Sequence, residues 1–353
     1  MQIAPETLWS RGQLETMPQC PACGTSNRTS VTFERRDNDA FMPDKWRMVR
    51  CGKCTSIWLN PRPDARSLPR AYDDYYTHHA ESDDRRLNGT RGLAWRMVHG
   101  YLNRRFDMHR HPASRFGYVV FSLIEPWRLK LDYFGRHLTR RRVGKPDRLL
   151  DVGCGNGGFL TRAVDMGWQV QGCEIDPKAV AICRDIGINV LEGDAFHPAL
   201  AEQSFNVVTM SHVIEHVVDQ RALLRRVNDL LRPGGWLWLA APNPASVGLH
   251  VFGSGWSELH PPCHLCIPSQ SILESWLQEE GFSNIHRFRR GAHARRAWQS
   301  SQSISQREAI PAPSASRIFS WRVIADALAT ISPRWAEETV LLAQKPVCSD
   351  ESR

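Results

Sequence analysis

The sequence has no long apolar run, no internal repeat and no apolar segment at its start. None of its 353 residues fall in an uncharged apolar stretch of the roughly 18 residues that a membrane-spanning helix needs. Glu6 and Arg11 bracket a mixed N-terminal segment, which argues against a secretory signal. We therefore expect a cytoplasmic protein without a transmembrane segment, and peripheral contact with a membrane stays open.

A disulfide framework is also not expected, although the chain has ten cysteines. Four of them form two C-x2-C pairs, Cys20/Cys23 and Cys51/Cys54, and the others are scattered through a large domain. Two such pairs typically complete a tetrahedral thiolate site for Zn²⁺. Because thiolates fill all four positions, the predicted zinc is structural. Unmetallated thiols are the alternative, since the segment between the pairs is longer than in most zinc ribbons.

Acidic residues are scarce in one part of the chain. The net charge is +8, and residues 85–145 hold fifteen Lys and Arg against three acids. Such a segment can contact RNA, an anionic membrane surface or an anionic or lipid-linked substrate. A solvated helical face is the alternative. Its aromatic and aliphatic residues favour ordinary packing over the entrance of the sheet.

Residues beyond about 148 alternate short apolar runs with helical patterns, which is typical of βαβ units around a parallel sheet. A helix is expected over 219–231. The Ser-, Gln- and Pro-rich segment 300–316 is expected to be a loop before a helix over 317–329. Seven strands are expected, at 149–152, 169–173, 189–191, 205–210, 236–241, 285–289 and 339–344. The predicted divisions are a zinc-ribbon module (1–63), a basic helical connector or lid (64–147), an α/β domain (148–346) and a tail (347–353).

A glycine-rich turn, Gly153-Cys154-Gly155-Asn156-Gly157-Gly158, follows the first expected strand. Glycines let the backbone approach a ligand there, but the pattern alone does not separate a nicotinamide dinucleotide from S-adenosylmethionine. A carboxylate at Asp151 in this crevice would repel a pyrophosphate and attract a sulfonium and an ammonium group. Glu174, after the second strand, can bind both ribose hydroxyls, and Asp194, after the third, can accept from the adenine amino group. Each acid alone could be a helix cap or a surface charge.

Together these segments resemble class I methyltransferases, which use S-adenosyl-L-methionine. The resemblance spans about 148–345 and also rests on Ser211–His216 and Leu231–Gly235. It implies a Rossmann-like α/β sheet of seven strands, with the last strand antiparallel between the fifth and sixth. The cofactor contacts expected on this basis are Asp151, Gly153, Cys154, Gly155, Glu174, Ile175, Asp194, Ala195, Ser211 and His212.

Methyl transfer from a sulfonium needs an aligned nucleophile and, in many cases, a base near the methyl group. In this resemblance His216 and Glu215 overhang the methyl end, and His216 is a candidate base; a structural pair is the alternative. His212, Glu215 and His216 also match the H-x-x-E-H pattern of zinc peptidases, which needs a helix at that point. The expected helix begins only near Asp219, so we do not predict a peptidase.

A long loop after the fifth strand carries Trp256, His260 and His264. It is similar to a loop that lines the acceptor pocket of small-molecule methyltransferases, so we expect substrate contacts from Trp256 and His260. His264 is a second candidate base, or only an anchor of the loop. Cys263 and Cys266 could form a metal cluster with the two histidines, but we favour thiols without such a function.

The cysteine module is followed by Tyr72, Tyr75 and Tyr76. It resembles the N-terminal module of methyltransferases that act on nucleotide-linked or polysaccharide sugars, which implies that the tyrosines help to close the acceptor pocket. Related sugar C-methyltransferases carry a further C-terminal domain that this sequence does not show. Sugar C-methylation is therefore not favoured.

We predict a methyltransferase that acts on a small molecule, sugar or glycan, preferably at oxygen, because no motif specific to N- or C-methylation occurs. The second hypothesis is an RNA methyltransferase whose zinc ribbon and basic connector bind RNA. The fourth strand lacks the Asn/Asp-Pro-Pro-Tyr of base methylation, which disfavours it. A third hypothesis, a zinc-ribbon scaffold without activity, is disfavoured by the presence of both Asp151 and Glu174.

Overall fold

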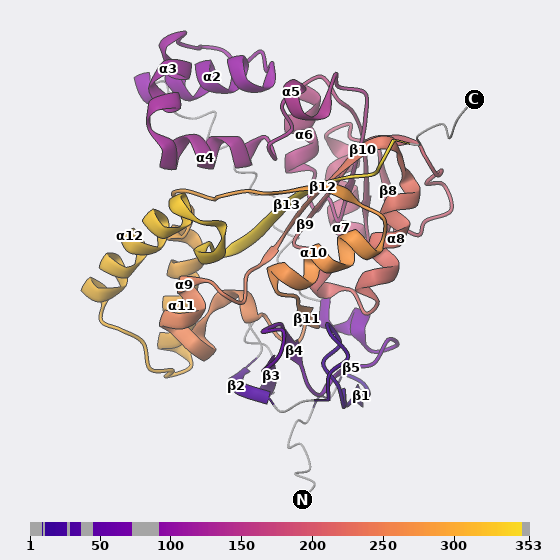
Figure 1. The fold of residues 1–353 in the computed structure, drawn as a ribbon, viewed down its shortest axis with the longest axis vertical. Helices are drawn as coiled ribbons and strands as arrows, with labels where there is room; N and C mark the ends of the chain where they lie inside the picture. Colours follow the sequence, from indigo (N-terminus) through magenta and orange to yellow (C-terminus); the bar gives the residue numbers. More distant parts are fainter. Residues whose placement is uncertain (1–8, 10, 27–28, 37–44, 73–91, 348–353) are drawn as a thin grey trace, which may run out of the picture.

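The computed structural model of the chain describes residues 9, 11–26, 29–36, 45–72 and 92–347. A seven-stranded sheet forms its centre, with the strand order β12-β13-β10-β9-β6-β7-β8 (Figure 1). Its strands are β6 (Arg148–Val152), β7 (Gln169–Glu174), β8 (Val190–Glu192), β9 (Phe205–Ser211), β10 (Leu231–Pro242), β12 (Ser283–Arg287) and β13 (Glu338–Gln344).

This sheet confirms the expected Rossmann-like topology. Strands β8, β7, β6, β9 and β10 are parallel, and β13 lies antiparallel between β10 and β12. All seven expected strands form at the expected places, and the expected helix 219–231 is α8 (Gln220–Leu230). Parallel strands place their carboxyl ends at one edge of the sheet, so the loops after β6, β7, β8 and β9 lie along that edge.

Both faces of the central sheet are covered, because successive strand residues point to opposite sides. On one face, Leu150 and Val208 pack in a core with α8 and α10 (Gln270–Glu279). On the other face, Leu149 and Val207 pack in a core with α6 (Gly158–Asp165), α7 (Pro177–Asp185) and α2 (Leu93–Phe106). The result is a three-layer α/β domain.

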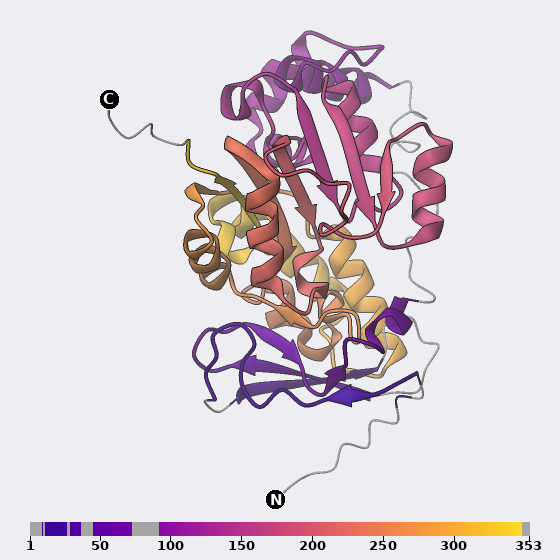
Figure 2. The same ribbon diagram turned by 90° about the vertical axis from the view of Figure 1, so that its right-hand side faces the viewer.

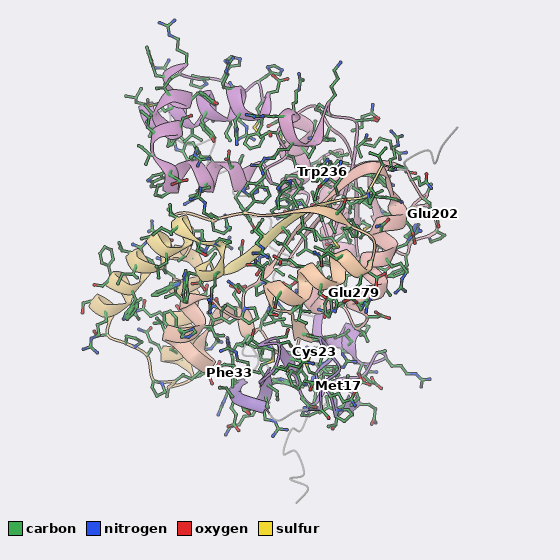
Figure 3. All side chains as sticks on the ribbon, in the orientation of Figure 1. Met17, Cys23, Phe33, Glu202, Trp236 and Glu279 are labelled. Carbon is green, nitrogen blue, oxygen red and sulfur yellow. The ribbon has the colours of Figure 1, made fainter. Side chains whose placement is uncertain are left out.

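The N-terminal module is a second, smaller sheet, which lies at the carboxyl edge of the central sheet (Figure 2). Its order is β11-β4-β3-β2, and only β11 (Cys266–Ile267) comes from the loop after β10. The module and the loop after β10 are therefore one structural unit. Figure 3 labels Phe33 on β2 of this sheet, Cys23 in the turn before β2, and Trp236 within β10. Its other strands are β2 (Thr29–Arg36), β3 (Lys45–Cys51) and β4 (Ile57–Leu59), beside a ribbon of β1 (Leu14–Glu15) and β5 (Arg62–Pro63).

The basic segment forms helices that pack beside the central sheet, on the face that α6 also covers (Figure 1). No helix in the described ranges combines the length and apolarity needed to cross a membrane. These helices are α2, α3 (Phe116–Leu123), α4 (Glu125–Phe134) and α5 (Arg140–Val143), and α4 also contacts α12 (Ala315–Ile331).

The prediction of a loop over 300–316 was wrong for its first half. Residues 295–307 form helix α11, and α12 begins at Ala315. The buried face of α11 holds two serines, Ser301 and Ser305, beside Trp298 and Ile304. The small serines allow close packing: a Cβ added at Gly255 would lie 2.1 Å from the Ser305 hydroxyl. The polar composition of this segment therefore did not predict helix α11, whose close contact with Gly255 needs small side chains.

Candidate active site

The glycine loop joins β6 to α6 with a backbone that only glycine adopts readily. Gly153, Gly155 and Gly157 have φ of 65°, 53° and 77°, in the left-handed region. A Cβ at Gly153 would lie 2.6 Å from Val213, which brings the segment after β9 against the loop. A Cβ at Gly155 would meet nothing within 4 Å, so this side of the loop faces open space that a ligand can fill.

Glu174 ends β7 and holds the glycine loop. Its two carboxylate oxygens accept the backbone N–H groups of Gly155 at 2.8 Å and Asp176 at 3.0 Å. Burial raises the pKa of this carboxyl, and these backbone donors act against that rise. The predicted ribose-binding carboxylate is thus fixed at the carboxyl edge of the sheet.

Asp151 does not face the crevice as an open carboxylate, which corrects the expectation from its charge. Its side chain is 1% exposed, accepts a hydrogen bond from Thr209 at 2.7 Å and forms an ion pair with Arg136. Burial raises the pKa of Asp151, and Arg136 opposes this rise. The Arg136 guanidinium lies 3.6 Å from the ring centroid of Phe159. The charge of Asp151 is thus paired within the protein by Arg136.

Around the expected adenine position, apolar side chains follow the second and third strands. Ile175 is 58% exposed and Phe196 is 50% exposed, at neighbouring strand ends. Asp194 is exposed and accepts the backbone N–H of Phe196 at 2.9 Å. Ala195 and Cys154, the second residue of the glycine loop, are buried. The sequence had not singled out Phe196, because one aromatic residue in a loop carries no pattern.

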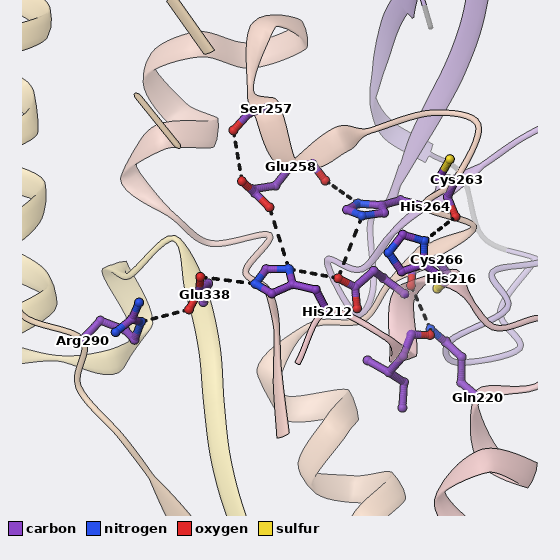
Figure 4. A network of polar contacts seen from close by, with 12 residues as sticks. His212, His216, Gln220, Ser257, Glu258, Cys263, His264, Cys266, Arg290 and Glu338 are labelled. Atoms are coloured by element: carbon purple, nitrogen blue, oxygen red, sulfur yellow. Dashed lines mark hydrogen bonds and ion pairs between the residues drawn. The ribbon is translucent and has the colours of Figure 1, made fainter. Parts of the chain in front are cut away.

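At the end of β9, His212 is a bridge between carboxylates (Figure 4). Its Nδ1 lies 3.2 Å from Glu215 and its Nε2 3.2 Å from Glu338, which also pairs with Arg290 at 2.9 Å. Burial alone would lower the pKa of His212, but these two carboxylates raise it well above the usual value. Its backbone N–H donates to Ala240, so the expected backbone contact of His212 with the cofactor does not use that group.

The candidate bases His216 and His264 lie next to each other, beside Glu215. The rings of His216 and His264 are 4.6 Å apart, and Nε2 of His264 lies 3.9 Å from Oε1 of Glu215. Nδ1 of His264 donates to the carbonyl of Glu258 at 2.7 Å, and Nδ1 of His216 donates to the carbonyl of Cys263 at 3.2 Å. Burial lowers the pKa of both histidines. The neutral imidazoles of His216 and His264 therefore lie on one side of the fully buried Glu215 carboxylate, and His212, whose pKa is raised, lies on the other.

The N-terminal module positions this cluster. Tyr72 lies with its hydroxyl 3.0 Å from Nδ1 of His216, and the Cys263 thiol donates to the carbonyl of Ala71. The backbone of Leu265 donates to Glu215, one residue before β11 joins the N-terminal sheet. The predicted contacts of Tyr75 and Tyr76 lie outside the described residues.

Two other predicted substrate residues are buried. Trp256 is 0% exposed, and its indole donates to Glu337 at 2.8 Å, so it supports the loop instead of lining an open surface. His260 packs 5.0 Å from the ring of His264, and burial lowers its pKa to about 3. Within the described residues, His264 groups with Glu215 and His216 as a potential metal-binding set.

The four N-terminal cysteines come together in two similar turns. Sγ of Cys20 lies 3.7 Å from Cys54, and Sγ of Cys23 lies 3.7 Å from Cys51. Bonds of about 2.3 Å to one tetrahedral zinc ion place thiolates roughly 3.8 Å apart, so the set fits Zn²⁺. The residue after each second cysteine, Gly24 or Thr55, has positive φ and donates its N–H to the first cysteine.

Residues 127–287 match the family model of a methyltransferase domain. The chain carries a class I S-adenosylmethionine-dependent methyltransferase domain. A ubiquinone biosynthesis O-methyltransferase of Xanthomonas campestris pv. campestris (strain B100) is 36% identical over 140 residues, which cover 36% of this chain and 55% of the relative. A protein of the same name from Xanthomonas oryzae pv. oryzae (strain PXO99A) is 34% identical over 135 residues, with the same coverage. The chain thus spans about half the length of these curated relatives.

Solved structures give distant matches to the methyltransferase domain. A SAM-dependent methyltransferase from Archaeoglobus fulgidus has 21% identity and a TM-score of 0.43, with coverage of 64% of this chain and 94% of that one. A Haemonchus contortus phosphoethanolamine N-methyltransferase in complex with S-adenosylhomocysteine has 18% identity and a TM-score of 0.41, with coverage of 57% and 49%.

Sequence reasoning missed several residues of the methyltransferase domain's polar network. Arg136 lies in a basic run in which nothing distinguishes it from its neighbours, and Glu338 is the first residue of β13. Glu258 follows Trp256 in an irregular loop. Only the folded chain brings these residues to Asp151 and His212.

Proposed function

We propose that this protein transfers the methyl group of S-adenosylmethionine to a hydroxyl oxygen of a small-molecule acceptor. The methyltransferase domain supports the donor, and the names of the relatives that match at 34–36% identity support oxygen as the acceptor atom. The observation that carries the proposal is the glycine loop, whose open side at Gly155 lies beside the fixed carboxylate of Glu174.

At the donor end, Glu174 accepts the ribose hydroxyls, and Ile175 and Phe196 supply exposed apolar surface for adenine. Asp194 accepts from the adenine amino group. The Asp151–Arg136 ion pair fixes the end of β6, where the glycine loop begins. Cys154, Ala195 and Ser211 shape the surrounding backbone. This chain binds and orients the cofactor, which supplies an activated methyl group with a good leaving group.

At the acceptor end, Glu215, His216 and His264 face the hydroxyl and assist its deprotonation. Val213 packs against Gly153, which places this cluster beside the donor loop. In-line displacement needs little beyond alignment of the oxygen, sulfur and methyl carbon, together with removal of that proton. Tyr72 and His260 border the cluster, and Tyr72 comes from the N-terminal module.

The four cysteines, Cys20, Cys23, Cys51 and Cys54, hold a structural Zn²⁺. Their sulfur–sulfur distances support this assignment. Zinc in this position stabilises the sheet to which β11 belongs and, through β11, the loop that carries His264.

A surface of mixed apolar and basic character favours a lipid-linked acceptor, such as a glycan carried on a lipid. We call it the α3–α4–α12 face, on the side of the molecule away from β8 (Figure 1). Basic groups lie over its aromatic rings: Arg115 over Phe116, Lys130 over Trp127 and Arg322 over Phe319. Basic aromatic helices of this kind bind anionic membrane interfaces. Its exposed apolar residues are Phe116, Val119, Leu123, Ile124, Trp127, Phe319, Trp321, Val323 and Ile324.

A groove of about 620 Å³ lies within this face, between α4, α11 and α12. Trp127, Trp298 and Phe319 supply apolar walls. Lys130 and Arg295 supply positive charge, and Arg322 pairs with Asp326 at 3.5 Å. An acyl or prenyl chain with an anionic head group fits this combination of walls and charge.

The function is tested by incubating the full chain with S-adenosylmethionine labelled in its methyl group and a panel of acceptors. The panel contains lipid-linked glycans, nucleotide sugars, polyprenylated phenols and RNA. We expect label in an ether-linked product from a hydroxyl acceptor, and loss of transfer in Glu215→Gln. Label in RNA alone, or no transfer to any acceptor by protein that binds the cofactor, would contradict O-methylation of a small molecule.

A further inference from the structure

Glu215 is the most unusual polar residue of the acceptor end. Its carboxylate is fully buried, and neither oxygen accepts a well-aligned hydrogen bond. The nearest charged partner is His212 at 3.2 Å, which is shared with Glu338. A buried carboxylate without hydrogen bonds is costly unless a cation binds it.

His264 turns an acceptor atom toward this carboxylate. A carbonyl oxygen can only accept, so the bond from Nδ1 to Glu258 places the ring proton on Nδ1 and a lone pair on Nε2. Nε2 lies 3.9 Å from Oε1 of Glu215, and both side chains are buried. Two acceptors that face each other at this distance repel, whereas one metal ion with bonds of about 2.1 Å bridges them.

His216 completes a set of three ligands. Nδ1 of His216 also donates to a backbone carbonyl, that of Cys263, so both imidazoles are oriented as metal-bound histidines usually are. Ligand atoms of Glu215, His216 and His264 lie within 4.8 Å of one another. Two imidazoles and one carboxylate suit divalent first-row metals and leave coordination positions open.

The local charge also favours a cation. In this network Glu215 and Glu338 share the positive charge of His212, Arg290 pairs with Glu338, and Glu258, whose pKa is raised by burial, lies 4.0 Å from the His212 ring (Figure 4). Coulomb energies are large in such a dry environment, so an added divalent ion is attracted to it.

We propose that Glu215, His216 and His264 bind one divalent metal ion, such as Mn²⁺, Fe²⁺ or Zn²⁺, and that this ion takes the acceptor hydroxyl. The second half of this proposal rests on the proposed function. The metal lowers the pKa of the bound hydroxyl, which releases its proton to water. The oxygen then forms a bond to the methyl carbon as the carbon–sulfur bond breaks with its electron pair to sulfur. The products are a methyl ether, S-adenosylhomocysteine and one proton.

This geometry favours an acceptor molecule that binds the metal ion through two oxygen atoms. A vicinal diol or a catechol can place two oxygens on the open positions of the ion, which fixes the reacting oxygen against the cofactor. Acceptors with two adjacent hydroxyls should therefore be methylated faster than those with one.

The test uses the full chain with one equivalent of Zn²⁺, which the four thiolates bind first, and with excess zinc removed, so that added Mn²⁺ reports on the second site. Electron paramagnetic resonance of free and bound Mn²⁺ should show one Mn²⁺ per chain, with nitrogen couplings from imidazole in pulsed spectra. Glu215→Gln and His264→Gln should each weaken binding at least about tenfold. His250→Gln, at a histidine whose ring bonds the Ser246 carbonyl at the start of its own helix, is the matched control and should bind normally.

The outcomes separate this site from the proposed function, because cofactor binding is measured by calorimetry on the same samples. Protein that binds S-adenosylmethionine but no Mn²⁺ or Co²⁺ overturns the metal site alone. Bound Mn²⁺ without nitrogen coupling, or equal binding by all variants, overturns it as well. Protein that binds Mn²⁺ at this site but no S-adenosylmethionine leaves the site standing and overturns the proposed function. If a variant fails to fold, the nitrogen couplings of the unmodified chain still decide the matter.

Discussion

At the scale of single residues, the buried ion pair of Arg136 and Asp151 links the basic segment to the glycine loop. Asp151 is 1% exposed and Arg136 is 8% exposed, and Thr209 and the Phe159 ring complete their surroundings. Removal of one partner of such a pair leaves an uncompensated charge, which costs far more than the pair contributes. The pair is thus a sensitive point of the cofactor site.

We predict that Arg136→Met lowers the free energy of unfolding by about 3 to 5 kcal/mol, because Asp151 stays buried without its counter-charge. The double variant Arg136→Met/Asp151→Asn should recover most of this loss. Arg140→Met, at an arginine with a side chain 60% exposed, should change stability by less than about 1 kcal/mol. Urea denaturation measures all three, and equal effects of the two single variants would refute the role of the pair.

Glu337 predicts a pH dependence of stability. Burial raises its pKa to about 7, despite hydrogen bonds from the indoles of Trp298 and Trp256. The unfolded chain ionises this group near its ordinary value of 4.5, while the folded chain keeps the proton to about 7. Its stabilising contribution is therefore present below 4.5 and is lost as the pH rises to about 7.

Glu337→Gln removes this titration, so its free energy of unfolding should fall less than that of the unmodified chain between about pH 4.5 and 7. Glu202→Gln, at an exposed carboxylate, is the control. Chemical denaturation across this pH range gives the slopes. Identical slopes for the Glu337 variant and the unmodified chain would show that Glu337 ionises normally.

Site residues were predictable where they adjoin a strand end and unpredictable where they depend on distant partners. Glu174 and the glycines follow apolar runs, so their place at the sheet edge follows from sequence order. The orientation of Asp151 does not follow, because Arg136 reaches it from a segment without distinguishing pattern. Trp256 was expected at the acceptor surface, yet Glu337, 81 residues later, holds it in the core.

At the scale of elements, β11 joins the loop that carries His264 to the N-terminal sheet. The strand contains only Cys266 and Ile267, which pair with Trp58 and Ile57 of β4. A two-residue strand carries no sequence signal, in contrast to the seven strands of the central sheet. Helix α11 was missed for a similar local reason, since serines form part of its buried face.

We predict that loss of zinc disturbs the catalytic loop through β11. Cys51→Ser should abolish the thiolate-to-metal absorption of cobalt-substituted protein and weaken acceptor methylation. Cys183→Ser, at a buried cysteine outside the cluster, should retain the absorption. A chain that contains no metal after zinc-supplemented expression, with unchanged activity in Cys51→Ser, would exclude the structural zinc.

At the scale of the whole molecule, the central sheet has different neighbours at its carboxyl edge and on its faces. The N-terminal sheet lies at the carboxyl edge, and the basic helices α2 to α5 pack on the face that α6 also covers (Figures 1 and 2). The α3–α4–α12 face adds an exposed apolar surface, with Leu123 80% exposed and Phe319 61% exposed. Apolar surface of this extent is unusual unless something covers it.

We predict that the full chain sediments with vesicles that contain phosphatidylglycerol and less with vesicles of phosphatidylcholine alone, because the face is basic as well as apolar. Leu123→Glu/Phe319→Glu should lose most of this binding. Val164→Glu/Ile186→Glu changes two exposed apolar residues on α6 and beside α7, away from this face, and should bind normally. Equal binding by both double variants would refute a specific membrane surface.

Binding of S-adenosylmethionine tests the central claim most directly. Isothermal titration calorimetry of the folded, zinc-loaded chain should show one bound cofactor per chain. Glu174→Gln should weaken that binding roughly tenfold to a hundredfold, because it removes a charged acceptor of the ribose hydroxyls. Glu192→Gln, at an exposed carboxylate that ends β8, should leave it unchanged. A folded chain that binds no S-adenosylmethionine, or binds it equally without the Glu174 carboxylate, would contradict the account.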